Sequence, residues 1–531
     1  MTPWWKGAVI YQIYPRSFFD SDQDGVGDLP GVTEKLDYVA NLGVDGIWLS
    51  PFFTSPMRDF GYDVADYYAV DPLFGSLDDF DALVMRAHAL HLKVIIDQVY
   101  SHTSDRHPWF LESRANQTND KADWYVWADA KPDGTPPNNW LSFFGGPAWS
   151  WDTQRRQYYL HNYLSEQPDL NFHNPEVQEA ILDVAKFWLD RGVDGFRLDV
   201  ANYYFHDPQL RDNPSSGASR AARPYHFQRH IFNRSRPETL SFLARLRQTL
   251  DGYAERMSVA EIASTSHIAR SIEYTEGGDR LHTAYNFLFL ESDELTPGLI
   301  RQAVSQWSSQ DAWPSWSFSN HDVVRAVTRW GGRDGDEGFS NLLIALLCCL
   351  RGTIFLYQGE ELGLSQADVP FDKLQDPEAI RFWPANLGRD GCRTPMPWVA
   401  RSVNAGFSTR PPWLPVDPRH EAKAVDLQEI TADSTLNFTR KMLALRRHHD
   451  ALRTGEMICL DIPEPVLAFE RISEVERIIC VFNLSGSPTT LPVSALPALG
   501  ASLDSGLEFT REAEAYILPA YGGGVALAKS K

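Results

Sequence analysis

The sequence predicts an α/β protein, a (β/α)8 TIM barrel with an inserted subdomain after the third strand and a C-terminal β-sandwich. Short apolar runs alternate with amphipathic stretches through the first two-thirds of the 531 residues, which is typical of successive parallel β-α units. Eight runs read as strands, and eight strands close such a barrel. They span residues 8–14, 45–50, 93–99, 195–200, 257–262, 283–287, 315–319 and 353–357.

Helices are predicted between several of these strands. Ser76 and Asp79 have the spacing of a capping box, and apolar residues follow at helical intervals. Asn174-Pro175 opens a second helix, because Pro suits the first helical turn, and Gly192 lies near its end. These strand–helix alternations indicate a parallel sheet.

Two polar excursions interrupt the alternation. Residues 102–169 are rich in Trp, Pro, Gly and Asn and separate the third strand from its helix, so we expect an inserted subdomain there. Residues 202–237 form a second excursion after the fourth strand. Both leave the end of the barrel where the strands finish, which is where active sites lie in this architecture. The barrel is then expected to comprise residues 1–101 and 170–456, and residues 457–531 the sandwich.

The composition limits the partners. The formal net charge is -21 and basic residues are not clustered, which argues against nucleic acid and anionic membranes as partners. An acidic surface also serves solubility alone. We expect a small-molecule ligand, no organic cofactor, and a monomer or homodimer.

The cysteines and the apolar segments indicate a cytoplasmic protein. Five cysteines are present and none forms a C-x-x-C pair, so there is no zinc pattern, and free thiols suit a reducing compartment. The first residues lack the basic and apolar regions of a signal peptide. The most apolar stretch, residues 342–350, is too short to span a bilayer.

Polar side chains follow four of the predicted strands. Three carboxylates, two histidines and one arginine would converge at one end of the barrel, and they are Asp199, Glu261, Asp322, His102, His321 and Arg197. A single Asp at a strand end is more often a helix cap or a loop residue. The whole constellation favours a catalytic site.

This set suits the cleavage of an acetal. Two carboxyl groups about 5–5.5 Å apart support a covalent glycosyl intermediate with retention of configuration. Arg197 lies two residues before Asp199, so in a strand both project to one side, and the cation should keep Asp199 ionised as nucleophile. Glu261 must start protonated, so we expect a raised pKa. Asp322 could bind sugar hydroxyls and disfavour ionisation of Glu261.

The two histidines have an alternative interpretation. His102 and His321 can donate hydrogen bonds to hydroxyls and to developing charge. They could instead ligate a metal, but no other His or Cys is spaced to complete a zinc site. We therefore favour substrate binding.

These segments resemble the conserved regions of the α-amylase superfamily, glycoside hydrolase family 13. Further segments resemble its additional region and its α-glucosidase and oligo-1,6-glucosidase branch, and the similarity covers roughly residues 4–455. The segments are residues 167–171, 9–18, 61–64, 357–361 and 393–398. Two positions depart from the family pattern, Ser101 where Asn is usual and Ala260 where Gly is common, and neither removes a catalytic group.

The resemblance implies roles for individual residues. Asp199 would be the nucleophile, Glu261 the acid/base and Asp322 the transition-state stabiliser. The side chains implied to bind the terminal glucose are Arg197, His102, His321, Asp59, Arg393 and Tyr62. Asp59 and Arg393 would hold its far hydroxyls and close the pocket, and Tyr62 would stack under the ring, although core packing is the alternative for that tyrosine.

The expected function is that of a retaining exo-acting α-glucosidase on short α-glucosides, with transglucosylation. In this branch Val200, after the nucleophile, is associated with α-1,6 linkages, whereas residues 206–214 and 391–393 resemble α-1,4-preferring enzymes. One methyl-sized difference is worth about 1–3 kcal/mol in discrimination, so maltose-type and isomaltose-type substrates both stay open. One alternative is a dedicated glucosyltransferase or sucrose-converting enzyme. A remote alternative is a non-catalytic transporter subunit; relatives of that kind lack the three catalytic carboxylates, which this chain keeps.

A separate acidic motif follows the first strand. Acidic residues alternate, with Gly25 at the sixth position, as at the start of a calcium loop, but Gly31 occupies the twelfth position where an EF-hand has Glu. One structural Ca²⁺ or Mg²⁺ would be bound by oxygens of Asp20, Asp22, Asp24, Val26 and Asp28. The alternative is a solvated acidic turn.

Overall fold

The chain folds around a closed barrel of eight parallel strands. In the computed structural model, which describes residues 2–221, 223–264, 266–307, 311–331 and 336–529, the strand order around the barrel is β1-β13-β12-β11-β10-β9-β5-β2. The strands are β1 (Val9–Ile13), β2 (Gly46–Leu49), β5 (Lys93–Gln98), β9 (Gly195–Leu198), β10 (Met257–Ile262), β11 (Thr283–Asn286), β12 (Pro314–Ser317) and β13 (Thr353–Tyr357). Each lies within or overlaps one of the eight predicted runs, so the predicted barrel is confirmed.

Apolar side chains fill the barrel. The first strand pairs with the last, Val9 with Ile354, which closes the sheet. Inside, Ile10, Trp48 and Phe355 belong to one buried cluster. As in other barrels of this type, the interior is a packed core and the ligand site must lie at one end.

Helices surround the barrel. The larger ones are α2 (Leu36–Leu42), α3 (Leu77–Ala89), α5 (Pro175–Asp190), α6 (Glu238–Asp251), α7 (His267–Thr275), α9 (Pro297–Gln306), α11 (Glu337–Cys349) and α15 (Thr435–His448). The shorter ones are α1 (Leu29–Glu34), α8 (Leu288–Glu291), α10 (Ala326–Arg329), α12 (Pro377–Phe382), α13 (Pro418–Glu421), α14 (Val425–Glu429) and α16 (Asp450–Arg453). The Ser76–Asp79 capping box that begins α3 is present, and the Asn174 side chain caps α5.

The segment after β5 forms the inserted subdomain. It contains α4 (Pro108–Ala115) and a small sheet of β6 (Trp127–Ala128), β8 (Gln157–Leu160) and β7 (Trp149–Asp152). Phe110 stacks on Trp127 at 5.6 Å between ring centroids. An antiparallel bridge between His102 and Asp169 brings the two ends of the segment together. The boundaries given for the three domains stay a prediction.

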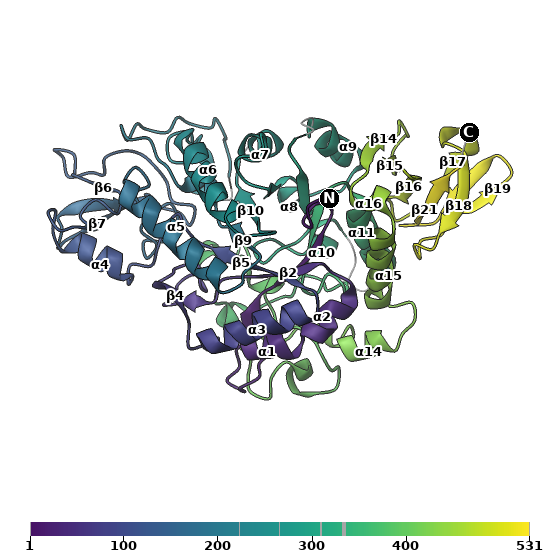
Figure 1. Cartoon of the computed structure of the whole chain (residues 1–531), viewed down its shortest axis with the longest axis horizontal. Coiled ribbons are helices and arrows are strands. Elements are labelled where there is room, and N and C mark those ends of the chain that lie inside the picture. The colour runs from purple at the N-terminus through teal and green to yellow at the C-terminus, as the bar shows by residue number, and fades with distance from the viewer. Residues whose placement is uncertain (1, 222, 265, 308–310, 332–335, 530–531) are drawn as a thin grey trace.

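The C-terminal part is all β. One sheet has the order β14-β15-β16-β21-β18 and a second has the order β17-β20-β19. Their bounds are β14 (Glu456–Cys459), β15 (Val466–Ile472), β16 (Arg477–Asn483), β17 (Thr489–Pro492), β18 (Leu499–Leu503), β19 (Thr510–Glu512), β20 (Ala515–Leu518) and β21 (Gly523–Ala528). The inserted subdomain and these sheets lie at opposite ends of the molecule (Figure 1).

A buried arginine ties the C-terminal sheet to the barrel. Arg471 of β15 is fully buried and donates to the Cys349 carbonyl at the end of α11, at 2.6 Å. A charged donor buried in this way must be paired with acceptors, so the sheet is fixed in its position against the barrel helix.

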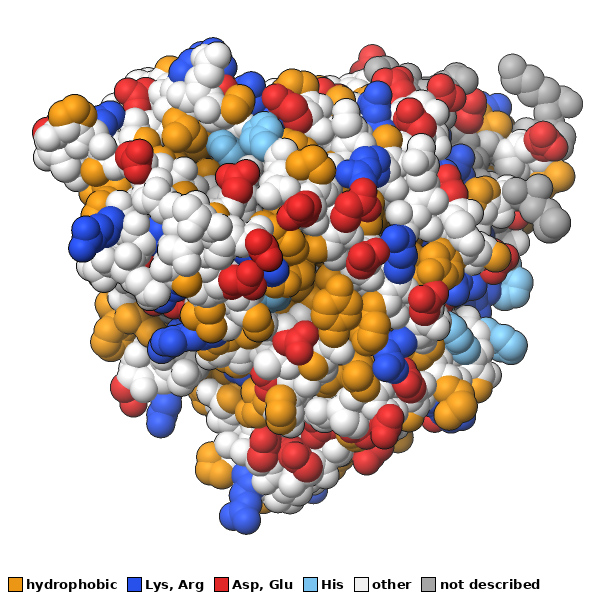
Figure 2. All heavy atoms as spheres, turned by 60° about the vertical axis from the view of Figure 1, so that its left-hand side comes forward, with side chains coloured by type: hydrophobic (Ala, Val, Ile, Leu, Met, Phe, Trp, Pro, Cys, Tyr) orange, Lys and Arg blue, Asp and Glu red, His pale blue; other side chains and the backbone are white. Residues whose placement is uncertain are grey.

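The surface is mixed in character. On the face shown in Figure 2, acidic, basic and apolar side chains are interspersed, and basic side chains do not gather into one patch. In the described part of the chain, no helix combines the length and apolarity needed to cross a membrane. The five cysteines form no disulfide.

Candidate active site

Barrel strands bring the predicted residues together at one end. Arg197 lies in β9, Glu261 lies in β10, and Asp199 follows β9 directly; a further acid, Asp97, which was not among the predicted residues, lies in β5. Asp97 is the register partner of Arg197 in the pairing of β5 with β9. Asp322 lies in the loop after β12. The neighbouring strands of a parallel barrel therefore place these charges in one volume.

Arg197 is the common neighbour of the acidic groups. The side chain is fully buried, and its Nη1 lies 2.8 Å from Asp97 and 2.7 Å from Asp199. Its Nη2 contacts the Glu261 carboxylate and donates to the Tyr285 hydroxyl at 3.0 Å. One cation thus orients the two carboxylates expected to do the chemistry.

The pKa of Asp199 is raised in spite of this arginine. Burial raises the pKa of Asp199 to about 7; Arg197 opposes this shift, and the charges of Asp97 and Asp322 add to it. Arg197 thus favours the ionised form of Asp199, as expected, but burial and two neighbouring carboxylates outweigh one guanidinium and the net shift of the pKa is upward.

Asp322 has the opposite environment. Arg393 Nη2 lies 2.7 Å from its carboxylate, His321 Nε2 3.2 Å and Arg389 Nη1 3.5 Å. Burial alone raises the pKa of Asp322, but His321 and the two arginine charges outweigh it and lower the pKa below its usual range. Asp322 is thus the carboxylate held in its charged form.

Two histidines, His102 and His321, contact Tyr62 at the bottom of the site, and burial favours their neutral form. Tyr62 and His321 stack at 5.4 Å with an interplanar angle of 8° and also share a hydrogen bond. His102 contacts the Tyr62 carbonyl at 3.0 Å, and Ser101 hydrogen bonds its Nδ1 at 2.8 Å. Burial lowers the pKa of His102 to about 4 and that of His321 to about 3.

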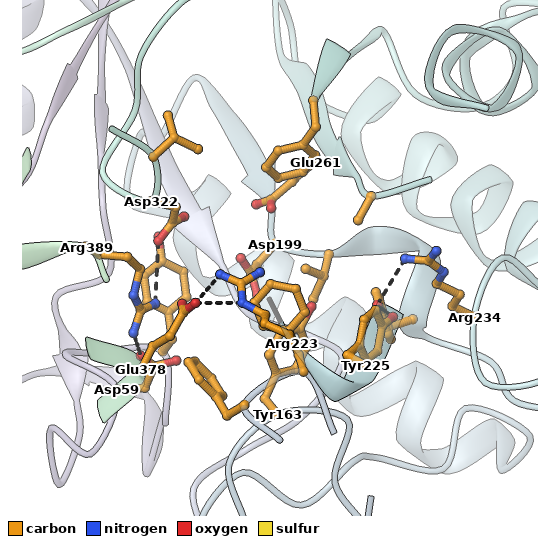
Figure 3. A pocket seen from close by; sticks show the side chains of 18 of the residues that line it. Asp59, Tyr163, Asp199, Arg223, Tyr225, Arg234, Glu261, Asp322, Glu378 and Arg389 are labelled. Atoms are coloured by element: carbon orange, nitrogen blue, oxygen red, sulfur yellow. Dashed lines mark hydrogen bonds and ion pairs between the residues drawn. The ribbon is translucent and has the colours of Figure 1, made fainter. Parts of the chain in front are cut away.

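These groups surround a cavity of about 490 Å³. Of the predicted residues, six line it, namely Asp59, Tyr62, His102, Asp199, Glu261 and Asp322. The other three, Arg197, His321 and Arg393, lie behind the wall and contact lining residues. Figure 3 shows the Asp199 and Glu261 side chains facing each other across the cavity.

Asp59 pairs with an arginine that the sequence analysis did not name. Arg389 lines the cavity and lies 2.7 Å from Asp59, whereas Arg393 is fully buried and holds Asp322 and the His321 carbonyl. Arg389 also bonds the buried Asp376 at 2.8 Å. Arg389 lies in an irregular segment, so no periodicity indicated it. Its position four residues before Arg393 was the one feature of the sequence that could have drawn attention to it.

The outer part of the cavity comes from the two excursions and from α12. Arg223 Nε lies 2.6 Å from Glu378 Oε1 and so connects residues 202–237 with α12. The remaining outer wall is largely aromatic, with Phe143, Phe144, Tyr163, Tyr203, Tyr225 and Phe287. Sequence reasoning did not single out these residues. All but Phe287, which directly follows β11, lie outside the regular β-α units, where no periodicity marks them.

Val200 lines the cavity in a strained conformation. Its φ of 35° and ψ of 48° lie in the left-handed region, which is unfavourable for a β-branched residue. Such strain persists only where surrounding contacts impose it, and it concentrates at functional sites.

The acidic loop after β1 has a geometry that suits a cation. One carboxylate oxygen each from Asp20, Asp22 and Asp28 lie within 4.8 Å of one another. Partial burial and the charges of Asp24 and Asp28 raise the pKa of Asp22, so the loop carries repulsion that a cation would relieve. Asp24 is not one of these three; its carboxylate accepts the Val26 N–H at 2.7 Å.

Known proteins are similar to this chain in sequence and fold. The family model described as the alpha amylase catalytic domain matches residues 12–455. A probable alpha-glucosidase from Rhizobium meliloti (strain 1021) is 52% identical over 509 residues, covering 93% of this chain and 92% of that protein. The chain belongs to the alpha-amylase family. An oligo-1,6-glucosidase from Heyndrickxia coagulans is 38% identical over 531 residues, with 91% and 93% covered.

Solved structures of the alpha-amylase family extend the likeness over the whole chain. The alpha-glucosyl transfer enzyme XgtA has a TM-score of 0.96 at 54% identity and covers 100% of both chains. A mutant of the trehalulose synthase MutB has a TM-score of 0.91 at 31% identity, with 99% of this chain and 100% of that chain covered. Family membership and alpha-glucosidase relatives make this protein a glycoside hydrolase.

Proposed function

We propose that the protein is a retaining exo-acting α-glucosidase that releases glucose from the non-reducing end of short α-glucosides. The observation that supports this most is the cavity itself. It holds Asp199, Glu261 and Asp322 together, and the Asp59–Arg389 ion pair lies in its wall. A charged pair in that position offers acceptors and donors for the hydroxyls of a terminal sugar. It also closes that side of the cavity, so that only the end of a saccharide chain can enter.

The proposed reaction has two displacements. Glu261 donates its proton to the glycosidic oxygen while an Asp199 oxygen bonds to the sugar C1, and the aglycone leaves as an alcohol. Glu261, now ionised, takes a proton from water, whose oxygen attacks C1 and releases Asp199 and glucose. When another sugar hydroxyl replaces water, the same step makes a new glucoside.

The remaining polar groups of the site would stabilise the transition states of these two displacements. Asp322 is held as an anion by Arg393 and Arg389, so it can bind hydroxyls of the distorted sugar and stabilise positive charge at C1. The neutral histidines His102 and His321 donate or accept hydrogen bonds without adding charge beside the cationic transition state.

A second function is supported by one comparison. XgtA, at 54% identity over the full length, is described as an alpha-glucosyl transfer enzyme, and the trehalulose synthase is a further relative. All catalytic groups would be shared, because transfer differs from hydrolysis only in the acceptor. A dedicated transferase is therefore the alternative.

We also propose one structural Ca²⁺ or Mg²⁺ in the acidic loop, bound by Asp20, Asp22 and Asp28 and completed by Asp24 and the Val26 carbonyl. Oxygen-only ligands suit these hard cations. The ion would fix the loop after β1 and take no part in bond cleavage. The free cysteines support a cytoplasmic location; a monomer or homodimer stays a prediction.

Product analysis tests the function. The protein is incubated separately with maltose, isomaltose and sucrose at low and high concentration. We expect glucose from maltose or isomaltose at low concentration and larger saccharides at high concentration. Transfer products without free glucose at low concentration would favour the transferase, and no reaction with any of the three sugars would contradict the proposal.

A further inference from the structure

Two arginines in the outer cavity have different partners. Arg223 is neutralised by Glu378, which is 1% exposed. Arg234 also lines the cavity, and among the described residues it has no carboxylate partner within 4.0 Å. Its hydrogen bond is a long one, from Nη1 to the Tyr203 hydroxyl at 3.4 Å.

The surroundings of Arg234 do not replace a counter-ion. Its guanidinium lies 5.8 Å from the Tyr225 ring centroid and 6.0 Å from that of Tyr203, at the outer limit of a cation–π contact. A guanidinium has five N–H donors, and the half-buried Arg234 uses one of them on Tyr203. The structure therefore leaves a cation in the cavity wall with most of its binding capacity available.

The lowered pKa values of two neighbouring histidines indicate a positive electrostatic potential around Arg234. Two histidines line the same part of the cavity. Burial lowers the pKa of His267 to about 4, and the Arg234 charge adds to the shift. Burial, Arg223 and Arg234 lower the pKa of His226. Glu291 also lines the cavity, and the Arg234 charge opposes the rise that burial causes in the pKa of Glu291. The Glu291 side chain is 62% exposed and lies 3.7 Å from His267.

The position of Arg234 relates it to the leaving group. In Figure 3, Asp59, Asp322 and Arg389 lie on one side of Asp199 and Glu261, and Arg234 lies on the other side. If the terminal glucose is held at the Asp59–Arg389 side, a group near Arg234 belongs to the aglycone or to an incoming acceptor.

We propose that Arg234 binds an anionic group, a carboxylate or a phosphate monoester, on the aglycone or acceptor. The enzyme then selects α-glucosides whose second half carries a negative charge. This inference rests on the proposed glucosidase function. Arg suits both anions because its planar fork can donate two parallel charge-assisted hydrogen bonds.

Matched glucosides test this proposal. We would measure kcat/KM for the 4-carboxyphenyl and 4-carbamoylphenyl α-D-glucosides, which have nearly the same shape but differ in charge. Arg234→Gln should lower the carboxylate-to-amide ratio at least about tenfold, the value of one hydrogen bond to a charged group. Because the ratio is compared between variants, the unequal leaving groups cancel. Arg234→Lys should keep part of the ratio.

Arg236 supplies the control. It lies two residues away, outside the cavity lining, where it faces Asp207 at 3.8 Å and Glu238 at 3.9 Å. Arg236→Gln removes the same charge and should leave the ratio unchanged. A 4-phosphonooxyphenyl glucoside separates the two anions: dependence on Arg234 for this substrate as well as the carboxylate supports a general anion site, and dependence for it alone supports a phosphate site.

Two results would overturn the inference. In the first, Arg234→Gln changes neither the carboxylate-to-amide nor the phosphate-to-amide ratio, either with no effect or with an equal fall for all three glucosides, which marks a purely structural arginine. In the second, Arg236→Gln changes the ratios as much as Arg234→Gln does. If Arg234→Gln does not fold, the wild-type enzyme decides, because added KCl should raise KM for the carboxylate and not for the amide. Failure of the wild-type enzyme to cleave the neutral glucoside would instead contradict the glucosidase function itself.

Discussion

At the scale of single residues, the carboxylates at the strand ends were predictable and their pKa values were not. Asp199 follows one apolar strand and Glu261 lies near the end of another, so their place at the end of the barrel could be predicted from the sequence. The pKa of Asp199 depends on burial and on Asp97 and Asp322, which are distant in the chain. Arg389 was missed for the same reason, since its role comes from contacts with Asp59 and Asp376.

The pKa of Asp199 predicts an acidic limb in the pH profile. Only the ionised Asp199 attacks C1 and only the protonated Glu261 donates to the leaving oxygen. For a neutral glucoside, kcat/KM should therefore fall tenfold per pH unit below about pH 7, and fall again at higher pH once Glu261 ionises. Asp97→Asn removes a charge that raises this pKa, and should move the limb to lower pH. A wild-type limb near pH 4, or a shift to higher pH in the variant, would contradict the assignment.

Val200 predicts a change in linkage preference. Val200→Ala removes the branched side chain from a strained position in the cavity wall. We expect the isomaltose-to-maltose ratio of kcat/KM to fall roughly tenfold, within the about 1–3 kcal/mol that a methyl-sized contact gives. Val200→Thr keeps the branched shape and adds a hydroxyl, which serves as a control for shape alone. Equal ratios in all three proteins would remove Val200 from the determinants of linkage.

At the scale of elements, periodicity and caps predicted the regular parts. The eight barrel strands and the caps of α3 and α5 came from local patterns that the structure confirms. Most of the outer wall of the cavity comes from residues 102–169 and 202–237 and from α12. These segments are held by turns and aromatic contacts, which give no periodic pattern from which to predict them. Their long-range pairs, such as Arg223 with Glu378, leave no local pattern in the sequence.

The loop after β1 predicts a metal-dependent stability. A chelator should lower the Tm and Ca²⁺ or Mg²⁺ should restore it, since an ion that binds only the folded state adds about 2.7 kcal/mol at 100 times its Kd. Asp22→Asn should abolish this response, because it removes a carboxylate from the cluster but keeps an oxygen that can accept the Asp24 N–H. Asp24→Asn, outside the cluster of three, should lose less. A Tm indifferent to chelator and ions would show an acidic turn without a cation.

At the scale of the whole molecule, separate parts of the chain build one site. The barrel supplies the reacting groups, the inserted subdomain supplies Phe143, Phe144 and Tyr163, and α12 supplies Glu378. The C-terminal sheets lie at the far end of the molecule from the inserted subdomain (Figure 1) and contribute no residue to the cavity lining. This division lets the outer wall vary while the chemistry stays fixed, so the acceptor is the least predictable property of the enzyme.

The most direct test of the central claim is to trap the covalent intermediate. A 5-fluoro-α-D-glucosyl fluoride should glucosylate the enzyme and turn over slowly, because the ring fluorine destabilises the cationic transition state of both steps while fluoride is a good leaving group. Peptide mass spectrometry should then find one fluoroglucosyl group on Asp199, and none in a folded Asp199→Asn variant. A label on another residue, or no label while the enzyme releases glucose of inverted configuration, would contradict Asp199 as the nucleophile of a retaining α-glucosidase.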